Sequence, residues 1–269
     1  MAAVEVESND STDTRRLARR TFFILCAIAV TLVALGPALR LWAAHARRND
    51  PAQSDVLPTL FDVNTEGNVP SWFAASLWLT AAILCLACGL LARRRRRQWV
   101  AMAVVCLLLS ADEAASFHER LFGTLGVAVL GDDRTPILHF AWVAPGALFA
   151  LMIVSACLRL VWSMPPPQRR AIVIAGLVFL SGALIMESVS GAVLSADGDR
   201  YWYVVATSLE EGLEKVAVIT FVCALISLVR VDRTGHRTMV ALRVDPAGSN
   251  TAAGRAVADS AAGPRKLDP

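Results

Sequence analysis

Charged residues are scarce in this chain of 269 residues. Asp, Glu, Lys and Arg make up 18% of it, whereas about 25% is usual in a soluble domain. Hydrophobic residues make up 55%, and the mean hydropathy is +0.51. This balance excludes an ordinary soluble domain and is typical of a membrane protein.

Other absences narrow the class further. No apolar segment lies close to the start, and the first long one lacks a small-residue cleavage site, so we expect it to be retained rather than removed as a signal peptide. The net charge of +3 comes mostly from arginines beside apolar segments, so it predicts no nucleic-acid partner. The six cysteines fall inside apolar segments, where small buried residues are commoner than a redox pair or a zinc site.

Six apolar segments are long enough to cross a hydrocarbon core about 30 Å thick at about 1.5 Å per residue. The sequence therefore predicts an all-α, polytopic membrane bundle of six transmembrane helices in contact with the lipid bilayer. The segments are residues 22–44, 71–91, 99–117, 137–162, 171–194 and 201–229. The predicted parts are a polar cytoplasmic segment (1–20), the transmembrane domain (21–230) and a disordered cytoplasmic tail (231–269).

Arginine clusters predict the orientation of the bundle. They precede the first segment, separate the second from the third, precede the fifth and follow the sixth. The alternate connections are poorer in arginine and carry most of the loop Asp and Glu residues. By the positive-inside rule, both termini are expected in the cytoplasm.

Seven carboxylates lie inside these segments or at their edges. A charged carboxylate at the bilayer centre costs about 2.5–3.5 kcal/mol on insertion scales, so a group of them needs a common reason. Shared cations, shared protons or a water-filled cavity would each provide one. The seven are Asp112, Glu113, Glu119, Glu187, Glu210, Glu211 and Glu214.

These residues are predicted to lie at similar depths. Asp112 is about 22 Å along the third helix, and Glu187 is about 25 Å along the fifth. Glu210 is about 13 Å below the outer end of the sixth helix. His118 and His139 lie near the same outer side. We therefore expect one polar site in the outer half of the bundle, open to the outside.

Helical phase refines this picture for the third helix. A regular step of about 100° places Asp112, Ser116 and Glu119 on one face, with Glu113 at its edge. The same step turns His118 about 120° away.

In the sixth helix, Glu210 and Glu214 share a stripe. Lys215 is placed to pair with Glu211 at the i+4 position, which would remove one negative charge without any ligand. Arg40, near the outer end of the first helix, is a candidate to neutralise a carboxylate or to hold an anionic substrate.

The same residue types suit a metal ion. Carboxylate and imidazole ligands favour Fe, Mn or Zn, and helical bundles build such sites from facing helices. The sequence lacks the Glu-x-x-His, HxxxH and HExxH elements of known metal sites. The residue composition therefore supports a metal site more strongly than the spacing of the residues does. Candidate ligands are Asp112, His118, Glu119, His139, Glu187, Glu210 and Glu214, and Glu113 or Glu211 is the candidate catalytic general base.

Two elements stand out along the chain: Asp-Glu-x4-His-Glu from Asp112 to Glu119, and Glu-Glu-x-x-Glu from Glu210 to Glu214. Together with FDVNTEGNVPSWFAASLWL, HFAWVAP and GALIMESVSG, they resemble an uncharacterised family of bacterial six-span integral membrane proteins. The likeness covers residues 61–228. It implies the bacterial plasma (inner) membrane as the location and implies no particular activity.

A looser similarity connects the chain with the membrane hydrolases of the alkaline ceramidase and progestin-receptor-like superfamily. Those proteins use a Ser, an Asp and three His around zinc. Ser76, Asp112 and His118 match this set loosely, whereas the late His pair is absent and acidic residues occupy the sixth helix.

Three functional classes follow. The first is a metal-dependent membrane enzyme that acts on a lipid or another apolar small molecule. The second is a proton- or cation-coupled transporter, which helices broken at Gly or Pro pairs near the site would favour. The only such pairs within the segments are Gly36-Pro37 and Pro145-Gly146, so this support is limited. The third is a structural or accessory subunit, in which the polar network only holds the bundle together.

Overall fold

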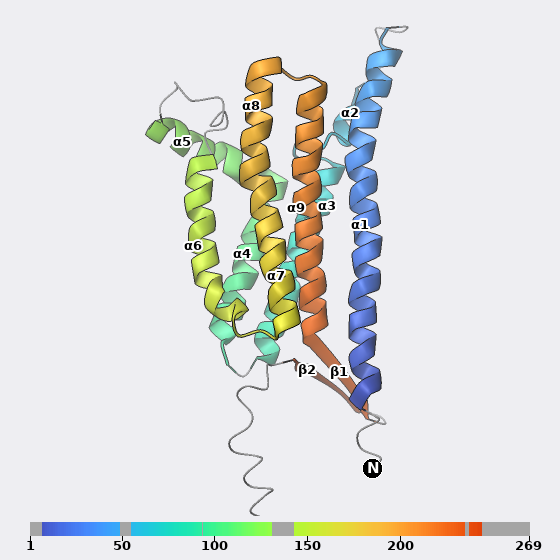
Figure 1. Ribbon diagram of the computed structural model, residues 1–269, viewed down its shortest axis with the longest axis vertical. Helices are drawn as coiled ribbons and strands as arrows, with labels where there is room; N and C mark the ends of the chain where they lie inside the picture. The colour runs from blue at the N-terminus through green and yellow to red at the C-terminus, as the bar shows by residue number, and fades with distance from the viewer. Residues whose placement is uncertain (1–6, 49–54, 93, 131–142, 235–236, 244–269) are drawn as a thin grey trace, which may run out of the picture.

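The computed structural model describes residues 7–48, 55–92, 94–130, 143–234 and 237–243 (Figure 1). Long helices stand side by side and form one bundle, so the all-α prediction is confirmed. The helices are α1 (Glu7–Ala46), α2 (Val56–Leu60), α3 (Val69–Leu91), α4 (Arg96–Ala115), α5 (Gly123–Leu130), α6 (Val143–Val161), α7 (Pro166–Leu180), α8 (Glu187–Asp197) and α9 (Tyr201–Leu228). The π-helical segments are η1 (His118–Phe122) and η3 (Ser181–Met186), and the strands are β1 (Val229–Thr234) and β2 (Arg237–Leu242).

Five described spans are long and apolar enough to cross a membrane, which confirms the class of multi-pass helical membrane protein. α9 is 28 residues long but is not among the five, because four charged residues stand near its middle. The five are Thr14–Ala46 within α1, α3, α4, α6 and the continuous span Pro166–Asp197, which joins α7, η3 and α8.

The start of α3 follows from its first residues. The Asn68 side chain accepts a hydrogen bond from the Ser71 backbone N–H (3.2 Å), and Ser71 Oγ accepts one from the Asn68 backbone N–H (3.0 Å). Pro70 fits in the first turn, where a backbone N–H has no helical partner. Asn68 also donates to the Thr65 carbonyl (2.7 Å), which turns the preceding loop back on itself.

The apolar core fills the half of the bundle that contains the end of α3 and the start of α4. Trp78 of α3 packs edge-on against Phe179 of α7, with ring centroids 5.2 Å apart, and tilts toward Phe221 of α9. Cys85 and Ile219 are fully buried in the same cluster. α9 lies at the centre, where it packs against α1, α3, α7 and α8.

Some boundaries differ from the prediction. α1 begins at Glu7, well before residue 22, and the predicted third helix ends at Ala115 rather than at 117. The expected start of the fourth helix, at 137, lies outside the described residues, which resume at Val143.

The structure differs from the prediction of a disordered tail (231–269) at the beginning of that segment. β1 and β2 pair as an antiparallel hairpin in the register Val231 to Val240, so secondary structure continues past residue 231. Arg243 fixes the hairpin to the bundle, because its backbone N–H donates to the Leu228 carbonyl (2.8 Å) and its side chain to Thr14 Oγ1 (2.9 Å). Residues 244–269 lie outside the described part.

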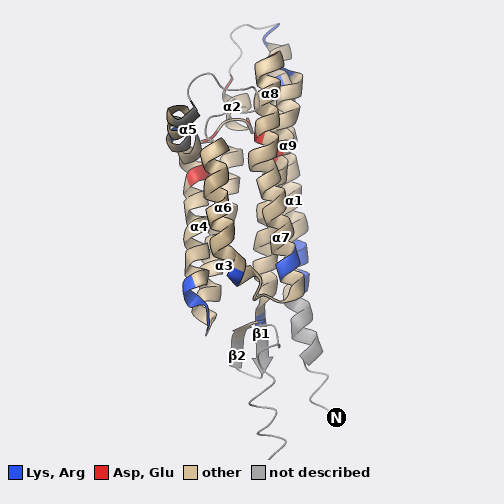
Figure 2. Cartoon of the chain, turned by 60° about the vertical axis from the view of Figure 1, so that its left-hand side comes forward, with Lys and Arg blue, Asp and Glu red and all other residues tan. Residues whose placement is uncertain are grey.

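The two ends of the bundle differ in charge (Figure 2). Lys and Arg residues gather where α3 meets α4 and where α6 meets α7, and we call this the arginine end (residues 94–97, 159 and 169–170). Asp and Glu residues lie toward the other end, which we call the acidic end. α1 begins and α9 ends at the arginine end.

Candidate functional site

The first part of the site joins α4 to the loop before α3. The His118 backbone N–H donates to Asp112 Oδ1 (2.7 Å), and His118 Nδ1 lies 3.0 Å from Asp112 Oδ2. Glu66 Oε1 lies 3.8 Å from the same ring nitrogen. All three side chains are about three-quarters buried, with 22–25% of each exposed. The histidine thus stands between two carboxylates.

A break in α4 makes this contact possible and corrects the predicted helical phase. Ser116 adopts a left-handed conformation (φ 54°, ψ 42°), and its backbone N–H donates to the Asp112 carbonyl (2.8 Å). A non-glycine residue with positive φ is uncommon, so it needs support from its surroundings. The bonds to Asp112 supply that support and turn His118 back toward this carboxylate instead of away from it. Glu119 belongs to η1 and not to α4.

The second part is an ion pair inside α9. Lys215 Nζ donates to Glu211 Oε2, as their i+4 spacing predicts, and only 2% of the Lys215 side chain is exposed. Glu113 of α4 lies within electrostatic range of both residues, and Glu214 lies within range of Lys215 and Glu113. A buried lysine therefore supplies positive charge among glutamates from two helices.

The third part joins α8 to α9. Ser190 Oγ donates to Glu210 Oε2 (3.0 Å), and its distance to the Glu187 carbonyl is also 3.0 Å. Ser190 and Glu210 are both buried. The Glu187 side chain lies within electrostatic range of the Glu210 side chain. Two carboxyl groups are thus held near one another where α8 meets α9.

The π-helical segment η3 sets the distance between these helices. A Cβ atom on Gly182 would lie 2.8 Å from Glu214 Cγ and 3.2 Å from the Glu210 carbonyl oxygen. Only glycine permits such a close approach. π-Helical turns inside α-helices are frequent at functional sites, and η3 ends directly before Glu187.

Tyr203 connects α9 to the loop before α3. Its hydroxyl donates to Asn64 Oδ1 (3.0 Å), and one turn further along α9 the Thr207 hydroxyl donates to the Tyr203 carbonyl (3.1 Å). Both α9 residues are buried. The loop that carries Glu66 is thereby held over the acidic end.

The contacts join most of the predicted site residues into one group, which we call the acidic cluster. Glu119 lies in η1, where its side chain is not described, and His139 lies outside the described residues. Arg40 does not join the group, because its guanidinium bonds Asp199 through both carboxylate oxygens (2.8 and 3.1 Å). The acidic cluster comprises Asp112, Glu113, His118, Glu187, Glu210, Glu211, Glu214 and Lys215.

The arrangement differs from a metal centre of the expected kind. Within the described residues, no three His, Cys, Asp or Glu side chains stand where they could hold one metal ion. Glu113, Glu211 and Glu214 instead lie around Lys215, and Asp112 bonds His118.

Two residues that contribute to the site are harder to find from the sequence. Glu66 stands out there only as part of a polar loop, and its approach to His118 depends on how Asn68 folds that loop. Gly182 carries a weak signal, because a glycine inside an apolar helix often marks close helix packing.

The fold and the cluster define a multi-pass helical membrane protein with a buried polar site. Residues 24–229 match a family described as "Domain of unknown function (DUF8692)", so the chain belongs to this family. The match includes every residue of the acidic cluster. No curated protein and no solved structure was found to match the chain.

Proposed function

We propose that this protein is a six-span, proton-coupled transporter of cations in the bacterial inner membrane, with the acidic cluster as its exchange site. One observation carries the proposal: regular α-helix is lost beside the carboxylates in two places. α4 ends at the left-handed residue Ser116, one turn after Asp112, and η3 interrupts the α7–α8 span directly before Glu187. In a membrane, irregular backbone is tolerated where it is buried in protein or lines a cavity. Transporters place their interrupted helices at the binding site.

The proposed chemistry is an exchange of positive charge. In this proposal, the neighbouring carboxyl groups of Glu187 and Glu210 hold one proton between them, and Lys215 pairs with Glu211. A cation that enters among these glutamates replaces the shared proton, because carboxylate oxygens ligate cations and bind protons with the same lone pairs. The proton then leaves, and the total charge of the cluster changes little. Cation binding and proton release are thus linked.

His118 is the proposed proton carrier between the carboxylates of the cluster and the outer side. Its ring contacts Asp112 on α4 and Glu66 in the loop over the acidic end. Histidine is the side chain whose usual titration range covers neutral pH, so it accepts and returns protons readily.

α9 is the proposed sixth crossing. Its charges point into the bundle, since 2% of Lys215 and 8% of Glu210 are exposed, whereas 56% of Leu209 is exposed. Charged residues that face a bundle interior do not prevent a helix from crossing a membrane. α1 also begins and α9 ends at the same end of the bundle, as an even number of crossings requires (Figure 1).

Cysteine labelling tests this topology. In intact cells, an impermeant maleimide should label Thr65→Cys and leave Ser260→Cys unlabelled until the membrane is opened, with the unsubstituted protein as the control for native cysteines. Labelling of both sites from outside would mean that α9 does not cross, and labelling of Ser260→Cys alone would reverse the orientation.

The metal-dependent enzyme is the competing hypothesis. Its support is the carboxylate and histidine composition, which suits Fe, Mn or Zn. The observed contacts give more support to proton exchange, because Lys215 already supplies positive charge where a metal ion would be needed. Elemental analysis of the purified protein distinguishes the two: one or two tightly held metal ions per chain would favour the enzyme.

The transport test uses liposomes that contain the purified protein and a pH-sensitive dye. Gradients of Na+, K+, Ca2+ or an organic ammonium ion are imposed in turn, and the internal pH is followed. We expect at least one cation to drive proton movement in the unsubstituted protein and in Asp197→Asn, which changes an exposed acid. Glu214→Gln should abolish it. Proton movement that never exceeds that of protein-free liposomes would contradict the proposal.

A further inference from the structure

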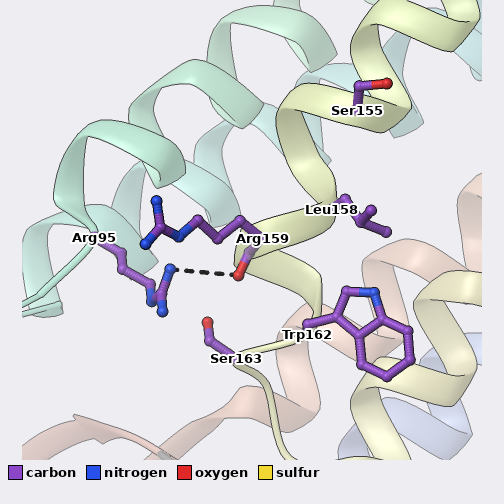
Figure 3. A pocket seen from close by; sticks show the side chains of 6 residues that line it. All are labelled: Arg95, Ser155, Leu158, Arg159, Trp162 and Ser163. Atoms are coloured by element: carbon purple, nitrogen blue, oxygen red, sulfur yellow. Dashed lines mark hydrogen bonds between the residues drawn. The ribbon is translucent and has the colours of Figure 1, made fainter.

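The arginine end carries a cavity of about 420 Å3 that is separate from the acidic cluster (Figure 3). It lies between the start of α4 and the end of α6. The turn after α6 closes one side. The lining residues are Arg95, Ser155, Leu158, Arg159, Trp162 and Ser163.

Two guanidinium groups face this cavity. Arg95 is the N-cap residue of α4, and its Nη1 donates to Gln98 Oε1 (3.2 Å) and to the Arg159 carbonyl oxygen (3.4 Å). Figure 3 shows Arg95 and Arg159 among the side chains that line the cavity. In the part of the chain that the structure describes, neither group has a carboxylate within 4.0 Å. Two guanidinium groups that line one cavity without a nearby carboxylate favour the binding of an anion there.

The other wall of the cavity is apolar and faces outward. Leu158 is 48% exposed and Trp162 is 61% exposed, and both belong to a helix that can span a membrane or to the turn after it. The Arg169 guanidinium lies over the Trp162 ring, 5.0 Å from its centroid. Tryptophan beside arginine is typical of the depth at which lipid headgroups meet the hydrocarbon core. The cavity therefore joins a cationic wall to a surface suited to acyl chains.

We propose that this cavity binds the phosphate of an anionic membrane phospholipid. The Arg95 and Arg159 guanidinium groups donate to the phosphate oxygens, an arrangement that suits the planar fork of arginine. The acyl chains follow Leu158 along α6. Basic pockets between transmembrane helices bind anionic headgroups in this way. The bound lipid connects the start of α4 to the end of α6.

Native mass spectrometry of the detergent-solubilised protein tests the site. The protein is titrated with phosphatidylglycerol and, separately, with phosphatidylcholine of the same acyl chains. The Arg95→Gln/Arg159→Gln variant should retain phosphatidylglycerol at least about tenfold more weakly than the unsubstituted protein, as expected when hydrogen bonds between charged groups are lost. The matched control, Arg94→Gln/Arg97→Gln, removes the same charge from neighbouring exposed positions outside the cavity. It should keep the preference within about twofold.

Three results would overturn the proposal. Equal retention of both lipids would show that the phosphatidylglycerol charge is not recognised. Equal loss in the two double variants would assign binding to the whole basic surface. Displacement of the lipid by excess inorganic phosphate would assign the cavity to a free anion. If Arg95→Gln/Arg159→Gln does not fold, the single variant Arg159→Lys is used instead. It keeps the positive charge but loses the planar guanidinium, so it should still weaken phosphatidylglycerol retention. Unchanged retention in that variant would also count against the site.

Discussion

The two halves of the bundle are made from the same long apolar helices, yet they differ in backbone regularity. Toward the arginine end, α3 and α9 are unbroken, and their facing side chains, such as Trp78, Cys85 and Ile219, are apolar. Toward the acidic end, α4 stops at a left-handed residue and η3 interrupts the α7–α8 span.

The difference follows from what each kind of side chain requires. Apolar side chains need only close contact, which regular helices provide when they pack together. Buried polar groups need hydrogen-bond partners at defined positions. At the acidic end, the break at Ser116 brings a backbone N–H to the Asp112 side chain, and the π-turn brings Gly182 against Glu214. The backbone thus departs from regularity after α4 and in the α7–α8 span, whereas α9 carries its charged residues on an unbroken helix.

The largest effect is expected when the buried cation is removed. Lys215→Met leaves glutamates without their partner, and breaking a buried ion pair costs about 3–5 kcal/mol of folding free energy. One turn further along α9, Ile219→Val removes a single methyl group from the apolar half at a cost of about 0.5–1.5 kcal/mol. Thermal unfolding and proton flux should both fall much further for Lys215→Met. Similar unfolding temperatures and fluxes for the two variants would mean that the acidic half is no more sensitive to substitution than the apolar half.

A smaller effect is expected when the close approach of η3 to α9 is blocked. Gly182→Ala places a methyl group 2.8 Å from Glu214 Cγ, and such overpacking costs about 1–3 kcal/mol. Because the clash displaces a cluster residue, proton flux should fall about tenfold or more. Gly176→Ala is the matched control on the same span, since no neighbouring atom lies within 4 Å of the position that its new methyl group would take. A flux equally low in both variants would show that any added methyl group disturbs this span.

A moderate loss of stability is expected when the contact between Asp112 and His118 at the end of α4 is weakened. Asp112→Asn keeps an acceptor for the His118 backbone N–H but loses the charge beside the ring, at a cost of about 1–3 kcal/mol. Ala114→Ser, at an exposed position on the same helix, should change stability by less than about 0.5 kcal/mol. Thermal unfolding of both variants checks this order, and equal tolerance would mean that Asp112 does not hold the break.

The smallest effect is expected at the exposed ion pair of the acidic end. Arg40 bonds both carboxylate oxygens of Asp199, but 28% and 54% of these side chains are exposed. Water and salt screen such a pair, so Arg40→Gln should cost no more than about 1 kcal/mol and leave proton flux intact. Loss of flux in this variant would assign Arg40 to the transport path.

Depth along the helices was predictable because the rise per residue is nearly constant. Counting residues predicted similar depths for Asp112, Glu187 and Glu210. The i+4 rule predicted the pair of Lys215 with Glu211, which is confirmed.

Helical phase beyond the break was not predictable. Unlike a glycine, Ser116 carries no sequence signal for a left-handed turn. A prediction that continues the regular helix through Ser116 therefore points His118 away from Asp112, whereas the structure turns it toward Asp112. The hairpin after α9 was missed for a related reason. Charged residues such as Arg230 and Arg233 mask the alternation of valines that marks β1.

Proton release upon cation binding tests the central claim most directly. The purified protein is placed in weakly buffered detergent solution with a pH dye, and the cation that drives flux in liposomes is added to saturation. We predict release of about one proton per chain, in exchange for the shared proton of Glu187 and Glu210, and no release from Glu187→Gln. Cation binding without proton release from the unsubstituted protein would contradict the account.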